Sequence, residues 1–108
     1  MILVFGGMYQ GKTEFAESLG KGLEIVPDFS EEIRLAMERG DDPDAYVEAR
    51  LPELAGSVVL MNDHSQGLVP MEADQRALRE ACGRAMIRLA RESEEVYRVF
   101  CGLGSRLK

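Results

Sequence analysis

The sequence predicts an α/β fold in which a small parallel sheet of about four strands is flanked by helices. The first observation is the run "MILVF" followed by two glycines, because a short apolar run that stops at glycine is typical of a strand buried on both faces. The second is that segments of this kind alternate with helical segments along the chain. Such strand–helix–strand units are right-handed and build parallel sheets. For 108 residues we expect one domain, residues 1–108.

The expected elements follow from apolar periodicity, capping residues and helix breakers. In order they are a strand over residues 2–5, a helix from residue 12 to about 20, a strand over 22–26, a helix over 30–39, an interrupted helical segment over 45–56, a strand over 57–61, a helix over 72–92 and a strand over 94–102. Ser30 is the expected N-cap of the second helix, and Asp42 or Asp44 that of the third. Pro52 interrupts the third. Residues 103–108 are expected to be a basic tail.

The composition excludes some classes of protein. With 19 acidic and 13 basic residues the net charge is −6, which argues against a general nucleic-acid binder because such proteins carry a basic surface. The longest apolar run at the N-terminus has five residues, so we expect no signal peptide, no membrane span and a cytoplasmic location. The spacing of Cys82 and Cys101 is not that of a metal site, and both are expected to be buried free thiols.

Three loops are expected to meet at one edge of the sheet. They are residues 6–13, 27–30 and 62–70, and each follows a predicted strand. Ligands of parallel sheets bind at the carboxyl ends of the strands. The sequence therefore predicts a ligand site where these loops converge.

The first of these loops has the spacing G-x-x-x-x-G-K-[ST], which is typical of a phosphate-binding loop between a strand and a helix. Glycines let the backbone approach phosphate oxygens and direct its N–H groups toward them. Lys12 would contact the β- and γ-phosphates, and the Thr13 hydroxyl would hold Mg²⁺. The alternative is an ordinary glycine turn. The expected nucleotide-binding residues are Gly6, Gly7, Met8, Tyr9, Gln10, Gly11, Lys12 and Thr13.

Acidic residues at neighbouring strand ends are candidates for the rest of the chemistry. Asp28 follows the predicted second strand and could share Mg²⁺ with Thr13, although it could equally be a turn aspartate after a proline. Glu24 and Glu31 are weaker candidates. Asp63 follows the third strand, where it could act as a general base or contact Mg²⁺. The alternative for Asp63 is a capped polar loop.

Three stretches together resemble one family. "ILVFGGMYQGKT", "VVLMNDHSQGLVP" and "RALREACGRAMIRLARESEEVYRVFCGLGSRLK" are similar to motifs of the bifunctional adenosylcobinamide kinase/adenosylcobinamide-phosphate guanylyltransferase family. The resemblance covers roughly residues 1–20 and 57–108. It implies a P-loop NTPase fold with a RecA-like core and a place in cobalamin biosynthesis.

The resemblance also implies substrates and site residues. Members of this family phosphorylate adenosylcobinamide with ATP or GTP, and then transfer GMP through a histidine–GMP intermediate. Lys12 and Asp63 are the expected catalytic residues, with Mg²⁺ as the cofactor. The second motif places Asn62, Asp63, Gly67 and Pro70 in a substrate loop, with Asp63 where the family has glutamate. Family members form oligomers, so a homo-oligomer is a further expectation, and the apolar stripe of residues 72–92 could either support it or pack on its own sheet.

Departures from the family pattern weigh against guanylyl transfer. The chain is shorter between its first helix and third strand, where the family carries the guanylylated histidine. The single histidine, His64, falls where the family has valine, and a covalent relay needs a nucleophile. We therefore expect a kinase that transfers the γ-phosphate of ATP or GTP to adenosylcobinamide. The alternatives are a nucleotide-binding module without catalysis and a P-loop kinase for another small acceptor.

Overall fold

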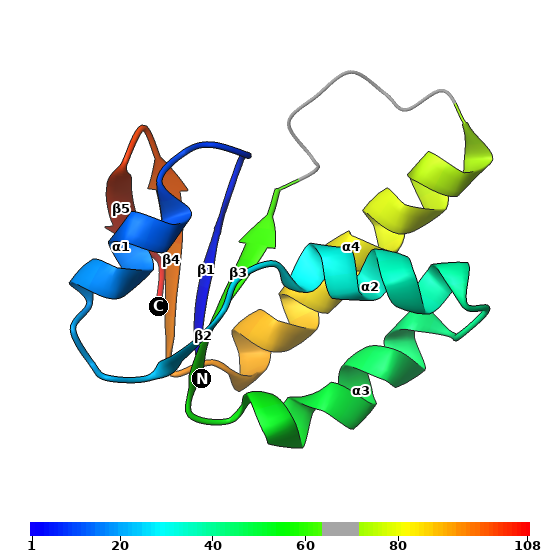
Figure 1. The fold of residues 1–108 in the computed structure, drawn as a ribbon, viewed down its shortest axis with the longest axis horizontal. Coiled ribbons are helices and arrows are strands. Elements are labelled where there is room, and N and C mark those ends of the chain that lie inside the picture. The colour runs from blue at the N-terminus through cyan, green and yellow to red at the C-terminus, as the bar shows by residue number, and fades with distance from the viewer. Residues whose placement is uncertain (64–71) are drawn as a thin grey trace.

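The computed structural model describes residues 1–63 and 72–108, which form an α/β structure (Figure 1). The elements in chain order are β1 (Ile2–Gly6), α1 (Lys12–Ser18), β2 (Glu24–Val26), α2 (Phe29–Glu38), α3 (Pro43–Leu54), β3 (Ser57–Asn62), α4 (Ala73–Glu92), β4 (Glu95–Phe100) and β5 (Leu103–Arg106). The predicted alternation of strands and helices is confirmed.

The sheet has five strands in the order β2-β3-β1-β4-β5. β1 lies at its centre and pairs in parallel with β3 and with β4, so that Ile2 is opposite Val58 on one side and Glu95 on the other. β2 is parallel to β3. The carboxyl ends of β1 to β4 therefore lie at the same edge of the sheet, as the sequence predicted.

The helices form layers on both faces of the sheet. α1 covers one face, and α2, α3 and α4 cover the other (Figure 1). Side chains alternate along β1 accordingly: Ile2 and Val4 belong to the core under α1, and Leu3 belongs to the larger core under the other three helices. Burial on both faces explains why β1 and β3 are continuous apolar runs.

The apolar stripe of α4 packs within its own chain. Cys82, Ala85 and Leu89 are buried in the larger core, and Leu78 and Met86 pack against it. Packing on the sheet and on α2 and α3 therefore accounts for the stripe, and it gives no support to an oligomer. In the part of the chain that the structure describes, no helix is both long and apolar enough to cross a membrane.

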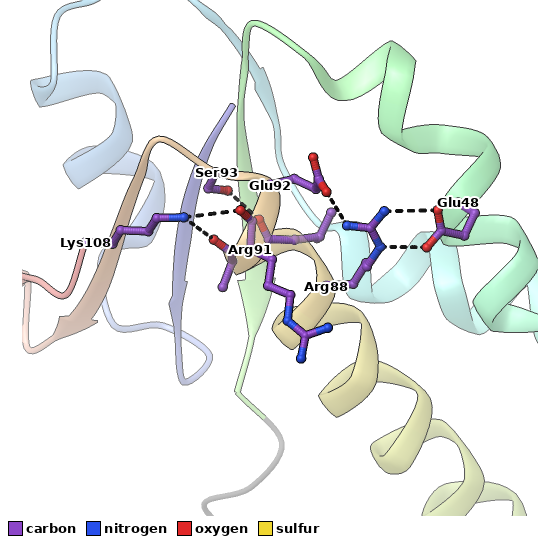
Figure 2. A network of polar contacts seen from close by, with 8 residues as sticks. Glu48, Arg88, Arg91, Glu92, Ser93 and Lys108 are labelled. Carbon is purple, nitrogen blue, oxygen red and sulfur yellow. Dashed lines mark hydrogen bonds and ion pairs between the residues drawn. The ribbon is translucent and has the colours of Figure 1, made fainter.

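The expected basic tail is instead the strand β5, which pairs antiparallel with β4. All four residues of β5 are exposed, so the sequence contains no burial pattern that would reveal a strand. The chain end is also anchored. Figure 2 shows the Lys108 side chain at the carboxyl end of α4, where its Nζ donates to the carbonyl oxygens of Ala90 and Arg91 at 3.1 and 3.2 Å. A cation at this position is favourable, because the last carbonyl groups of a helix have no partner within it.

The predicted N-cap of α2 is wrong by two residues. The cap is Asp28, whose side chain accepts a hydrogen bond from the N–H of Glu31. Ser30 is inside the helix and buried, and its Oγ accepts from the N–H of Asn62 at 3.1 Å. Both residues can cap a helix, and the partner of Ser30 at the end of β3 could not be predicted from local sequence.

Two further local predictions have mixed outcomes. Asp42 caps α3 by accepting from the N–H of Ala45, as expected. Pro52 does not interrupt α3, which continues to Leu54. The proline lies near the carboxyl end of the helix, so little of the hydrogen-bonded ladder is lost. Of the two free cysteines, Cys82 is buried but Cys101 is exposed, which corrects the expectation for Cys101.

Candidate functional site

The loop between β1 and α1 needs glycine at both ends. A Cβ on Gly6 would lie 2.4 Å from the carbonyl oxygen of Val99 in β4, which is far inside contact distance. Gly11 has φ 87°, in the left-handed region that glycine adopts at little cost. Tyr9 also has positive φ, 59°, although it carries a side chain. The loop is therefore tightly turned, and its first glycine lies directly against β4.

Lys12 begins α1 and folds back over the loop. Its Nζ donates to the carbonyl oxygen of Gly7 at 2.6 Å. Burial lowers the pKa of the Lys12 ammonium below its ordinary value, and the negative charge of Asp28 opposes that shift. The ammonium is thus a partly desolvated cation whose charge would attract an anion, and the nearby Asp28 carboxylate offsets part of that attraction.

Asp28 caps a helix and also lies beside the loop. Its Oδ1 caps α2 by accepting from the N–H of Glu31 at 3.1 Å, and its side chain also lines the cavity beside the loop. Glu31, a weaker candidate, instead pairs with Arg34 on the surface of α2, and this hydrogen bond lowers its pKa. Asp28 is therefore the carboxylate that the fold brings to Lys12.

One cavity of about 660 Å³ joins these parts. A volume of this size lies within the usual range for sites that bind small molecules. Its lining comes from the loop, from the segment after β2, from the end of β3 and from the turn after β4, and comprises Met8, Tyr9, Gln10, Gly11, Lys12, Thr13, Glu14, Pro27, Asp28, Leu60, Asn62 and Gly102. The predicted convergence of loops at the carboxyl edge of the sheet is confirmed for its described residues.

The residues at the end of β3 and after it are described only in part. Asn62 lines the cavity, whereas Asp63, within the described residues, is not part of the lining. Asp63 is nevertheless next to the loop, because its N–H donates to the carbonyl oxygen of Gly6 at 2.8 Å. Gly67 and Pro70 lie outside the described residues, as does His64.

The two residues that the sequence predicted as ligands of a divalent cation, Thr13 and Asp28, both line the cavity and carry oxygen donors, a hydroxyl and a carboxylate. Residues 1–63 and 72–108 contain no cluster of three His, Cys, Asp or Glu side chains that could hold a metal alone. Mg²⁺ usually binds through one or two protein ligands, the phosphates of its substrate and water. These donor types therefore fit a magnesium ion that brings its remaining ligands with it.

Sequence reasoning missed the side of the cavity formed by the β4–β5 turn. Gly102 lines the cavity there, and the N–H groups of Cys101 and Gly102 both donate to Gln10. The only available signal was the pair Cys101–Gly102 between two apolar residues, which suits a two-residue turn when glycine takes positive φ.

Comparison of the chain with models of known protein families, and with curated protein sequences, found no match. A functional proposal therefore depends on the geometry of the cavity and on the resemblance of the motifs.

Proposed function

We propose that this protein binds a nucleoside triphosphate with Mg²⁺ and transfers its γ-phosphate to the hydroxyl group of a small molecule, adenosylcobinamide. The observation that carries the proposal is a single cavity lined by the glycine loop, Lys12 and Asp28. A phosphate-binding loop with its lysine and an acidic neighbour are recurring parts of proteins that transfer phosphoryl groups.

The loop and Lys12 would bind the phosphates. Left-handed residues at positions 9 and 11 give the loop the sharp curvature with which backbone N–H groups can converge on an anion. Lys12 would exchange its bond to the Gly7 carbonyl for phosphate oxygens, and its positive charge would offset charge that builds up during transfer. Positioning and charge neutralisation supply most of the catalysis in reactions of this type.

Thr13 and Asp28 would hold the Mg²⁺ that enters with the nucleotide. Both side chains line the same cavity as the loop, and Asp28 is fixed by its role as helix cap. The ion would screen the charge of the phosphates as the acceptor approaches.

The acceptor is proposed on the resemblance of the Asn62 motif, and Asp63 is its proposed general base. Asp63 would take the proton from the acceptor hydroxyl while that oxygen forms a bond to the γ-phosphorus and the bond to the β-phosphate oxygen breaks. The products would be the phosphate ester and the nucleoside diphosphate. The backbone bond from Asp63 to Gly6 supports this role, since it holds Asp63 beside the start of the loop.

A nucleotide-binding module without transfer is the second candidate. It is favoured by one observation: Asp63, which the structure describes, is not one of the residues that line the cavity. This candidate keeps Lys12, Thr13 and Asp28 in their binding roles and leaves Asp63 as a structural residue.

The test is to incubate the purified protein with Mg²⁺, ATP or GTP, and adenosylcobinamide, and to identify the products by mass spectrometry. Lys12→Ala removes the phosphate contact, and Lys21→Ala is the matched control because Lys21 is exposed and pairs with Glu95 away from the cavity. We expect phosphorylated cobinamide with the parent protein and with Lys21→Ala, but none with Lys12→Ala.

Other results would reject parts of the proposal. Nucleotide binding without any corrinoid product would leave a binding module or a kinase for another acceptor. Cleavage of nucleotide that depends on a different small hydroxyl compound would select the second of these. A GDP-linked product would show that guanylyl transfer proceeds despite the missing histidine.

A further inference from the structure

The β4–β5 turn makes a two-point contact with the middle of the phosphate loop. The N–H of Cys101 donates to the side-chain oxygen Oε1 of Gln10 at 2.7 Å, and the N–H of Gly102 donates to the backbone oxygen of Gln10 at 2.8 Å. The loop and the turn also approach closely at the next position, where a Cβ on Gly11 would lie 3.1 Å from the Cα of Gly102. Gln10 is thus held through both its side chain and its backbone.

Residues in the left-handed conformation surround this contact. Tyr9 and Gly11, on either side of Gln10, have φ 59° and 87°, and Cys101 and Gly102 have φ 52° and 76°. Two successive residues with positive φ are typical of a type I′ turn, which directs the N–H groups of the turn outward. Cys101 adopts this conformation although it is not glycine, and such a residue persists only where its surroundings hold it.

The hairpin that carries the turn is anchored at its other end. The N–H of Leu107 donates to the carbonyl oxygen of Val96 at 2.7 Å, and Lys108 is bonded to the end of α4 (Figure 2). In the middle of the hairpin, the Phe15 ring lies directly over Gly104, where a Cβ would be 2.0 Å from the ring. Figure 1 shows the β4–β5 turn beside the loop that leaves β1. The turn is therefore the tip of a hairpin whose middle and far end are both held by contacts with the rest of the protein.

We propose that the β4–β5 turn positions the phosphate loop, with Gln10 as the positioning residue through which it acts. The two bonds hold the loop in its binding shape before a nucleotide arrives, so less conformational freedom is lost when the phosphates bind. The inference rests on the proposed nucleotide site. It adds to that site the β4–β5 turn, which is far from the phosphate loop in the sequence. Gly102 lies on the wall of the same cavity, so the turn also borders the proposed nucleotide site.

The test compares Gln10→Ala with Gln75→Ala, which is the same substitution at an exposed site on α4 away from the loop. Amide hydrogen exchange, followed by NMR without nucleotide, reports the bond to Cys101. Calorimetric titration with Mg·ATP and with Mg·GTP reports the affinity. For Gln10→Ala we expect faster exchange at Cys101 and about three- to tenfold weaker binding, the loss that corresponds to one neutral hydrogen bond.

The weakening should be the same factor for both nucleotides, because the loop holds phosphates and not the base. The melting temperature should change little, since the bond is at the surface, and Gln75→Ala should match the parent in every measurement. Gln10→Glu keeps an acceptor oxygen at this position, so slow exchange at Cys101 should return in that variant, and this second variant serves if Gln10→Ala does not fold.

Several results would overturn the inference. Equal affinity of Gln10→Ala and the parent would show that the contact does not position the loop. A loss confined to one nucleotide would mean that Gln10 contacts the base. Rapid exchange at Cys101 in the parent or in Gln10→Glu would show that the bond is not held in solution. A parent protein that binds neither nucleotide would reject the proposed function and the inference with it, whereas a parent that binds leaves the two questions separate.

Discussion

Replacing Gly6 by alanine tests the close approach of the phosphate loop to β4. The added Cβ would lie 2.4 Å from the carbonyl oxygen of Val99, where ordinary contacts begin at 3.4 Å. The neighbouring atom is backbone in the centre of the sheet, so neither strand can move aside without loosening the pairing of β1 with β4. Crowding of this kind costs about 1–3 kcal/mol of the free energy of unfolding.

For a chain of this size, that cost corresponds to a melting temperature lower by about 4–12 °C. The assay is thermal unfolding followed by far-ultraviolet circular dichroism, together with urea unfolding at 25 °C to confirm the free energy. Because Gly6 is the first residue of the loop, the variant should also bind nucleotide more weakly at a temperature where it is still folded.

Gly83→Ala is the matched control, with an effect of opposite sign. Gly83 lies in the middle of α4, and a Cβ there would meet no atom within 4 Å. Alanine is better than glycine inside a helix by about 0.5–1 kcal/mol, so this variant should be more stable than the parent. If Gly6→Ala were as stable as the parent while Gly83→Ala behaved as expected, the close approach of Gly6 to β4 would be refuted.

Three further predictions concern charge and exposure. Nucleotide affinity should fall as the pH rises above the lowered pKa of free Lys12, because bound phosphates favour the protonated form of this side chain. Calorimetric titration over that pH range should show no such fall for Lys12→Ala. A fall of the same size in the variant would contradict the role of the lysine. A thiol reagent at neutral pH should modify the exposed Cys101 and spare Cys82, because burial raises the pKa of the Cys82 thiol to about 11. Equal rates of modification of the two cysteines, measured by mass spectrometry, would contradict this packing. Glu32→Gln should lower the free energy of unfolding, measured with urea, by about 1 kcal/mol, because Glu32 in α2 accepts two hydrogen bonds from Arg50 in α3. An unchanged midpoint of urea unfolding would show that the pair adds no stability.

The parts of the fold that were predictable from the sequence depend on local periodicity. β1 and β3 are apolar runs because both of their faces are buried, and α4 carries an apolar stripe because one side of it packs on the core. Alternation of these elements predicted the parallel sheet, and the parallel sheet predicted where the loops would meet. The candidate site was therefore located from the strand–loop–helix pattern around Lys12.

The parts that were not predictable depend on contacts between distant residues. β5 is exposed along its whole length, so its pairing with β4 leaves no periodic signal. Ser30 and Asp28 are equally good caps by residue type, and the Ser30 hydroxyl instead accepts a hydrogen bond from Asn62, a residue far away in the sequence. The contact of Gln10 with Cys101 joins residues 91 positions apart, a distance at which local patterns carry no information.

The most direct test of the central claim is calorimetric titration of the parent protein and of Lys12→Ala with Mg·ATP and Mg·GTP. We predict that the parent binds at least one of the two nucleotides at a single site. Lys12→Ala should bind it about 10- to 100-fold more weakly, the loss expected for a hydrogen bond between two charged groups. No binding by the parent, or equal binding by the variant, would contradict the assignment of this cavity as a nucleotide site.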